Sequence, residues 1–273
     1  MSTVQAGPLL AVDGPLPVEP PFNLFSVAEP ISDRWLAGVN VWPYPPDIAS
    51  GQDPCGEGSL RDKSEGEGYT SPTFYGFSAY LPVTCSTIGN NLDEVEKRAE
   101  AALNATDHVA AERQLVSGAY TGGPYLAETT NVLNSGAATL AQPALSYLEQ
   151  EIAEETGRRG VIHADPATVA AWSYFGALRV VARQLQTYQG TPVVVGAGYI
   201  NAHPDGESAP APGASYAWAS GPIMAEREGM RLSDELSDYI DVSINLYVYR
   251  AERNILVAWD DLFSASILVD WVP

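Results

Sequence analysis

The chain has 273 residues, of which 45% are hydrophobic and 18% charged, so it can bury one or two domain cores. No apolar run approaches the roughly 20 residues of a membrane-spanning helix, and the lysine-free, proline-broken N-terminus is unlike a secretory signal. Fourteen Lys and Arg against 34 Asp and Glu give a net charge of −20, which argues against sequence-specific DNA binding. An acidic chain can nevertheless enclose nucleic acid without gripping it.

The N-terminal segment, residues 1–32, is predicted to be an extended arm. Its prolines remove backbone donors and fix φ, so the segment has no core of its own. Apolar side chains on such an arm need a surface, either on the body of the chain or on a neighbouring subunit; the alternative is a free tail. These side chains are Leu9, Leu10, Phe22, Leu24 and Phe25.

Two strand-like stretches, 35–42 and 74–84, enclose a long segment rich in Gly, Pro, Asp and Ser. This arrangement predicts a projecting loop or flap. Its charged cluster includes Arg61, Lys63 and Glu65. Lys63 is either a solvated charge or, beside a carboxylate, a residue that cross-links to an Asn of a neighbour, which requires a neutral, buried lysine.

Cys55 and Cys85 are the two cysteines of the chain. Two cysteines in a chain of this length form neither a disulfide scaffold nor a zinc ribbon. They are either free thiols in a reducing compartment or a single Cys55–Cys85 bridge, and the sequence leaves both readings open because it does not supply the Cα spacing.

The clearest helix is predicted from Asn91, a capping residue, to Gly118, with Glu112 on its polar face. Interleaved helices and strands follow and predict an α+β or α/β body. The further helices are expected at 143–157 and from Asp165 through Leu185. The strands are expected at 160–163, 191–196, 215–220, 242–250 and 255–259, with residues from Ile223 onward pairing back onto 215–220.

Candidate chemical motifs are weak. The stretch 193–200 (VVVGAGYI) resembles the start of a dinucleotide fingerprint, but Asn201 replaces the third glycine and a turn follows, so a strand entering a loop is favoured. His163 and Asp165 lack further metal ligands, and Asp165 is better explained as a helix cap before a proline. His108 is expected to be exposed or half-buried. We therefore assign no catalytic, cofactor-binding or metal-binding residue.

The order of these parts is itself informative: proline-rich arm, long polar loop, long helix, mixed body and late strands. Several stretches agree in detail, and together they resemble the major capsid protein of tailed bacteriophages of the Hong Kong ninety-seven type, a fold shared with encapsulin shells. These stretches are Gly160–His163 with the following Ala164-Asp165-Pro166, Gly190–Val195, Ser215–Ser220, Tyr249–Arg253 and Ile255–Trp259.

The resemblance implies an α+β fold with five parts. They are an N-terminal arm (1–32), an extended β-hairpin loop (33–88), a peripheral domain with a spine helix (89–143), an axial domain (144–236) and a return to the peripheral domain (237–273). It also implies that inter-subunit contacts involve Leu9, Leu10, Phe22, Leu24, Phe25, Arg61, Lys63 and Glu65.

The implied function is that of a structural virion protein without enzymatic activity or cofactor. Copies would assemble through hexamers and pentamers into an icosahedral shell around double-stranded DNA, in the host cytoplasm, without a membrane. Scaffolding, portal or decoration proteins are the further partners that the resemblance implies. The alternatives are an encapsulin-like compartment, a tail or decoration protein, and an enzyme that uses 193–200 with nearby carboxylates.

Overall fold

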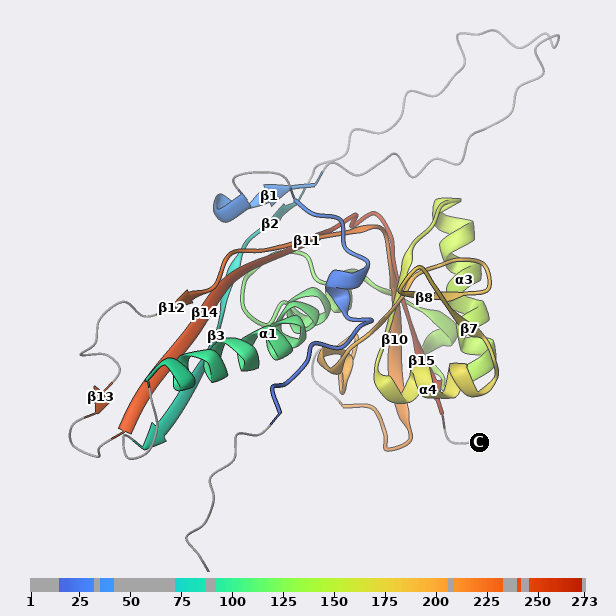
Figure 1. The fold of residues 1–273 in the computed structure, drawn as a ribbon. Coiled ribbons are helices and arrows are strands. Elements are labelled where there is room, and N and C mark those ends of the chain that lie inside the picture. The colour runs from blue at the N-terminus through green and yellow to red at the C-terminus, as the bar shows by residue number, and fades with distance from the viewer. Residues whose placement is uncertain are drawn as a thin grey trace, which may run out of the picture.

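The computed structural model describes residues 15–31, 35–41, 72–86, 92–205, 209–232, 240–241 and 246–271. These residues form two halves, each a sheet covered by helices, which lie side by side (Figure 1). The helices are α1 (Leu92–Ser117), α2 (Leu126–Thr129), α3 (Ala141–Thr156) and α4 (Pro166–Tyr174), with the short 3-10 turns η1 (Leu24–Ser26), η2 (Trp35–Ala37), η3 (Leu133–Gly136) and η4 (Ala197–Tyr199). The strands are β1 (Val39–Asn40), β2 (Thr73–Phe74), β3 (Phe77–Ser86), β4 (Asn131–Val132), β5 (Thr139–Leu140), β6 (Val161–Ala164), β7 (Leu178–Val181), β8 (Gln184–Thr187), β9 (Val193–Val195), β10 (Ala214–Ser220), β11 (Ile223–Arg227), β12 (Arg231–Leu232), β13 (Ile240–Asp241), β14 (Leu246–Trp259) and β15 (Ser264–Asp270).

The first half, which we call the α1 half, is organised around the long strand β14. Strand β3 pairs antiparallel along one edge, from Phe77 opposite Ile255 to Ser86 opposite Leu246, and β11, β12 and β13 share the other edge. Helix α1 lies along one face of this ribbon, and the aliphatic stripe of the helix packs on alternate residues of both strands (Figure 1). The result is the larger of the two hydrophobic cores.

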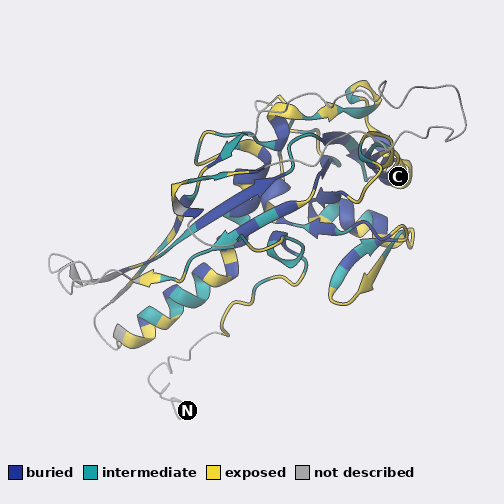
Figure 2. Ribbon diagram, turned by 90° about the horizontal axis from the view of Figure 1, so that it is seen from above, coloured by how far each residue is buried: buried dark blue, intermediate teal, exposed yellow. Residues whose placement is uncertain are grey.

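The second half, the α3 half, contains a mixed sheet in the order β4-β15-β10-β6-β9. Helices α3 and α4 cover it and enclose a second core around Trp172, whose indole N–H donates to the Ala141 carbonyl at 2.8 Å. The strands at the centre of both sheets are the most buried parts of the chain, whereas the far end of α1 is exposed on its outer side (Figure 2).

Local signals in the sequence correctly located most elements. Asp165 caps α4, since its carboxylate accepts the Thr168 amide at 2.8 Å with Pro166 in the first turn. Gly157 ends α3 in a left-handed conformation with φ 57°, which a residue without a side chain adopts at little cost. The long helix predicted at 91–118 is α1, and the α+β fold class is confirmed.

Four predictions of local structure were wrong. The helix expected to run through Leu185 ends at Tyr174, and a hairpin of β7 and β8 follows, with Ala182 and Arg183 in the positive-φ turn that two-residue hairpins favour. Residues 35–42 contain a 3-10 turn and only the two-residue strand β1. Both remaining errors concern the crossing between the halves.

Two of the chain's crossings between the halves, from β10 to β11 and from β14 to β15, break the predicted strand pairings. Strand β11 pairs with β14 instead of turning back on β10, because β15 and β6 already occupy both edges of β10. Strand β14 is continuous over what was expected to be two strands, and it leads into β15 of the other sheet. The two crossings bond to each other through Gly221 N–H to Phe263 O at 3.3 Å and Asp260 N–H to Pro222 O at 3.0 Å.

Candidate functional site

Within the described part of the arm (residues 15–31), the segment 19–31 is seated on its own subunit across both halves. Asn23 folds the arm into a turn by donating to the Glu19 carboxylate at 2.7 Å and to the Pro20 carbonyl at 2.9 Å. Further along, Glu29 joins the edge of β11: its amide donates to Ile223 O at 2.9 Å, and its carbonyl accepts from Ala225 N–H at 3.0 Å. The arm is therefore attached to the fold at both ends of η1.

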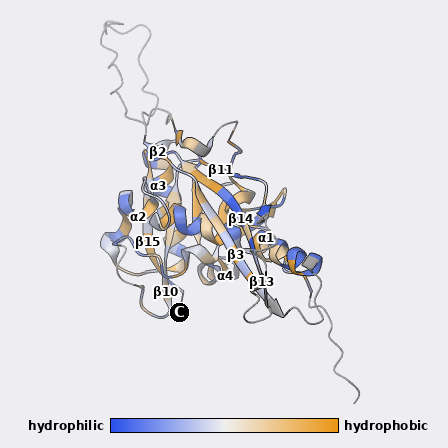
Figure 3. Cartoon of the chain, turned by 90° about the vertical axis from the view of Figure 1, so that its left-hand side faces the viewer, coloured by the Kyte–Doolittle hydropathy of each residue, from blue (hydrophilic) through white to orange (hydrophobic). Residues whose placement is uncertain are grey.

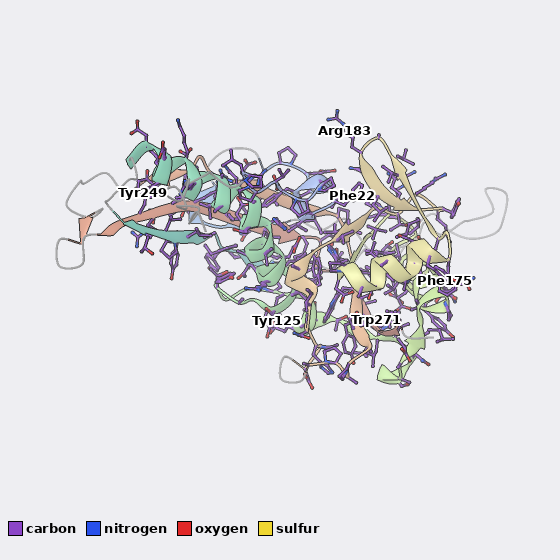
Figure 4. The ribbon with its side chains drawn as sticks, turned by 60° about the horizontal axis from the view of Figure 1, so that its bottom comes forward. Phe22, Tyr125, Phe175, Arg183, Tyr249 and Trp271 are labelled. Atoms are coloured by element: carbon purple, nitrogen blue, oxygen red, sulfur yellow. The ribbon has the colours of Figure 1, made fainter. Side chains whose placement is uncertain are left out.

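Three apolar residues of the arm occupy different environments. Leu24 has no exposed surface and belongs to the core of the α1 half. Phe22 packs against the core of the α3 half, and its carbonyl accepts the Val195 amide at 2.8 Å (Figure 4). Phe25 lies beneath the Arg227 guanidinium, 4.5 Å from the ring centre, as a cation–π pair. One short segment thus ties the two halves together.

A polar clasp reinforces this seat. The Arg227 guanidinium binds Glu19 of the arm at 3.2 Å and Asp107 of α1 at 3.3 Å, and Arg253 of β14 binds Asp107 at 2.6 Å. The Asp107 side chain is fully buried, so these two partners carry its charge compensation. Burial alone would lower the pKa of Arg227, but Glu19 and Asp107 outweigh it and raise that pKa.

His108 stands beside this clasp. Its ring, expected to be at least half-exposed, is buried, and its Nδ1 has no hydrogen-bond partner. Burial lowers the pKa of His108, and the Arg227 charge adds to this, against the opposing effects of Glu19 and Asp107. Glu19, Asp107 and His108 have ligand atoms within 4.8 Å of one another, but the two guanidiniums already hold both carboxylates and would repel a cation, so we assign no metal site here.

The glycine motif at 196–198 is a seat for a carboxyl group and not a nucleotide loop. Strand β9 leads into η4, and Gly198 N–H donates to Oε2 of Glu112 on α1 at 3.0 Å. A Cβ at Gly196 would collide with the same carboxyl. Glu112 is completely buried, which corrects its predicted place on the polar face of the helix.

A second buried polar group connects β6, η4 and β10. His163 lies 3.0 Å from the Tyr199 hydroxyl through Nδ1 and 3.0 Å from the Ser220 hydroxyl through Nε2. Desolvation lowers the pKa of His163 to about 3, so the ring is neutral. Although serine and histidine can form a nucleophilic pair, these three side chains have no exposed surface and Ser220 donates to Gly221 O at 2.9 Å. The arrangement is a structural network.

The α3 half presents an exposed apolar surface that the sequence did not reveal. Tyr174 is 86% exposed and packs edge-on against Phe175 at the end of α4, and Val180 and Tyr188 of the adjacent hairpin are 61% and 66% exposed. Phe175 and Arg183 are labelled in the α3 half in Figure 4, whereas in Figure 3 hydrophobic and hydrophilic residues alternate along the ribbon of α1. Grouped aromatic side chains in water are typical of a contact surface. The sequence analysis missed these residues because it predicted a helix where the β7–β8 hairpin forms.

The structure brings Phe22, Leu24 and Phe25 together on the arm. The remaining predicted contact residues and Cys55 lie outside the described residues: Leu9, Leu10, Arg61, Lys63 and Glu65. Cys85 is described only by its backbone, which pairs with Tyr247 across β3 and β14. The cross-link and the disulfide therefore stay predictions.

Comparisons with known proteins identify the fold. No protein-family model and no curated protein matches the sequence. A solved chain of Gordonia phage Cozz is 13% identical with a TM-score of 0.57, and the match covers 97% of this chain and 91% of that one. A chain from the capsid of a native GTA particle is 12% identical with a TM-score of 0.57, covering 97% and 94%. A chain of Microbacterium phage Oxtober96 is 12% identical with a TM-score of 0.54, covering 98% and 96%.

Among the described residues, no helix is long and apolar enough to cross a membrane. The matches to these solved structures cover nearly the whole length of each chain. The chain therefore has the fold of phage capsid proteins of the Hong Kong ninety-seven type.

Proposed function

We propose that this chain is a major capsid protein, which assembles through hexamers and pentamers into an icosahedral shell around a phage genome. The observation that carries the proposal is the full-length match of its fold to a chain from the capsid of a GTA particle and to chains from phages. These matches cover 97–98% of this chain and 91–96% of the solved chains, so they extend well beyond one half of the fold. Fold alone does not define function, so the surfaces must also suit assembly.

Two surfaces support assembly. The aromatic group Tyr174, Phe175 and Tyr188 is exposed on one end of the α3 half, where copies arranged around a ring axis would bury it. On the arm, Leu16 is 64% and Val18 is 85% exposed, immediately before the seated segment. None of the described residues covers either patch, and we assign the cover to a second copy of this chain.

The negative charge of the chain suits a protein that encloses DNA without binding it tightly. A net charge of −20 keeps packed DNA from adhering to the protein. The buried Ser220–His163–Tyr199 network and the Glu112 seat both serve the fold, and no step of the proposed role requires catalysis. The proposal therefore includes no enzymatic activity, a location in the virion, and scaffolding, portal or decoration proteins as further partners.

A deletion tests the arm's part in this role. Removal of residues 1–32 would strip Leu24 from the core, so the informative deletion is residues 1–14, which leaves the seated segment intact. We expect light scattering to give a particle mass far above the 29.1 kDa subunit for the full chain and a folded, small species for the truncated chain. Particles of equal mass from both chains would remove residues 1–14 from the assembly mechanism, and a full chain that stays monomeric with its partners present would contradict the proposed function.

A further inference from the structure

The Glu112 carboxyl occupies the point at which the arm, α1 and the loop after β9 meet. The side chain has no exposed surface, Oε2 accepts the Gly198 amide at 3.0 Å, and Oε1 has no hydrogen-bond partner. Gly196 leaves the space that the carboxyl fills, because a Cβ there would collide with the carboxyl atoms, and Gly198 allows the close approach to α1, because a Cβ there would meet Glu112 Cβ and the helix backbone. The seat is therefore shaped around this one acidic group.

The same point holds the arm. Leu24 is buried in the core that α1 helps to form, and a hydrogen bond from its backbone amide lowers the pKa of the Glu112 carboxyl. Next to it, Phe22 O accepts Val195 N–H at 2.8 Å, one residue before the glycine seat. A change in the charge of Glu112 therefore acts on the arm and on the α3 half together.

The surroundings of Glu112 offer its negative charge little compensation. On α1, Arg113 is exposed and His108 lies one turn earlier, beside Glu19 of the arm; on η4, Tyr199 faces the carboxyl and shares its hydroxyl with His163. The segment Leu24–Ser26 and strand β9 bring no charged side chain. Burial raises the pKa of Glu112 to about 8, and the amides of Gly198 and Leu24 and the charge of Arg113 offset only part of this effect. At neutral pH the folded carboxyl holds a proton.

We propose that Glu112 is a proton-dependent latch, which holds residues 19–31 of the arm and the 196–200 loop on α1 while it is protonated and frees the arm when the proton leaves. Loss of the proton places an unpaired negative charge among buried groups, and opening of the arm returns that charge to water. The latch lies within a single subunit, so it can be tested on the unassembled chain, and its failure would not contradict the proposed shell formation.

Hydrogen–deuterium exchange of the full, unassembled chain tests the latch. The amides of Ser26, Val27 and Ala28 donate within the η1 turn and report whether the arm is seated. An open glutamate titrates near its ordinary value of 4.5 and the seated one near 8, so opening becomes easier as pH rises between these values. After correction for intrinsic exchange, we expect protection of these amides to fall nearly tenfold per pH unit from about pH 6 to 8 and then to level off.

Matched variants separate the latch from general alkaline loosening. Glu112→Gln, or Glu112→Met if the first variant fails to fold, should remove the pH dependence of arm protection. Glu149→Gln is the control, because Glu149 is also buried with one oxygen unpartnered, but it binds Thr191 in the α3 half away from the arm; this variant should keep the slope. Flat protection in the wild type, or an unchanged slope in either Glu112 variant, would overturn the proposal.

Discussion

Truncation of Leu24 tests whether the arm is part of the folded subunit. Leu24 has no exposed surface and belongs to the core of the α1 half, so Leu24→Ala removes buried methyl groups and leaves a cavity. Substitutions of this kind cost about 2–5 kcal/mol of unfolding free energy. The arm is bonded on both sides of Leu24, to Val195 and to β11, and it cannot shift to fill the space, so we expect a loss of about 3 kcal/mol or more.

Urea unfolding of the unassembled chain, followed by tryptophan fluorescence, measures this loss. The matched control is Leu16→Ala on the same arm, where the side chain is 64% exposed and the change should stay within about 0.5 kcal/mol. The midpoint should move for Leu24→Ala with an unchanged denaturant slope. Equal, small effects of both substitutions would show that the seat contributes nothing to subunit stability, and would refute the interpretation that this segment spans both halves.

Three further predictions follow from buried polar groups and close packing. Asp107→Asn leaves Arg253 without its buried counter-charge and should lower the unfolding free energy by about 3 kcal/mol. Glu252→Gln, which removes an exposed pair with Arg250, should change the unfolding free energy by less than about 1 kcal/mol. Equal effects of the two substitutions in urea titrations would contradict this prediction. Gly196→Ala collides with the Glu112 carboxyl and should cost about 1–3 kcal/mol in the same assay, against no comparable loss for Gly122→Ala, which meets open space. The pKa of His163 is about 3 when folded and near 6.5 when unfolded, so the unfolded chain binds a proton first, and His163 contributes a loss of about 1.4 kcal/mol of unfolding free energy per pH unit as pH drops below 6.5. Glu112, whose pKa is raised to about 8, contributes a slope of opposite sign above its ordinary value of 4.5, so the informative quantity is the difference between the wild type and His163→Gln. In urea titrations between about pH 6 and 4 this difference should change by about 1.4 kcal/mol per pH unit, and a difference independent of pH would contradict the prediction.

Local chemistry accounts for what the sequence predicted correctly. The Asp165 cap and the long helix α1 were both predicted from local patterns, and the structure confirms both. The order of such elements was sufficient to predict the fold of the chain, and the matches to solved capsid structures confirm it.

Long-range pairing accounts for what the sequence missed. Strand β11 looked like a hairpin partner for β10 because only a Gly-Pro turn separates them, but the edges of β10 are filled by strands distant in sequence. Glu112 looked like one of several solvated acids on α1, and its burial depends on Gly196 and Gly198, far along the chain. The one available signal was the Gly-Ala-Gly stretch, which indicated a close backbone approach without naming the group that approaches.

Electron microscopy of the purified full chain tests the central claim most directly. The account predicts closed spherical shells, or hexameric and pentameric rings, with subunits that show α1 lying along the β3–β14 ribbon and the exposed aromatic group of the α3 half buried between copies. Nucleic acid inside the particles would support the phage capsid, and a packaged protein would instead support an encapsulin-like compartment. Tubes or isolated rings of a single size would indicate a tail or decoration protein, and a uniform monomer or dimer that does not assemble with its partners present would contradict the account.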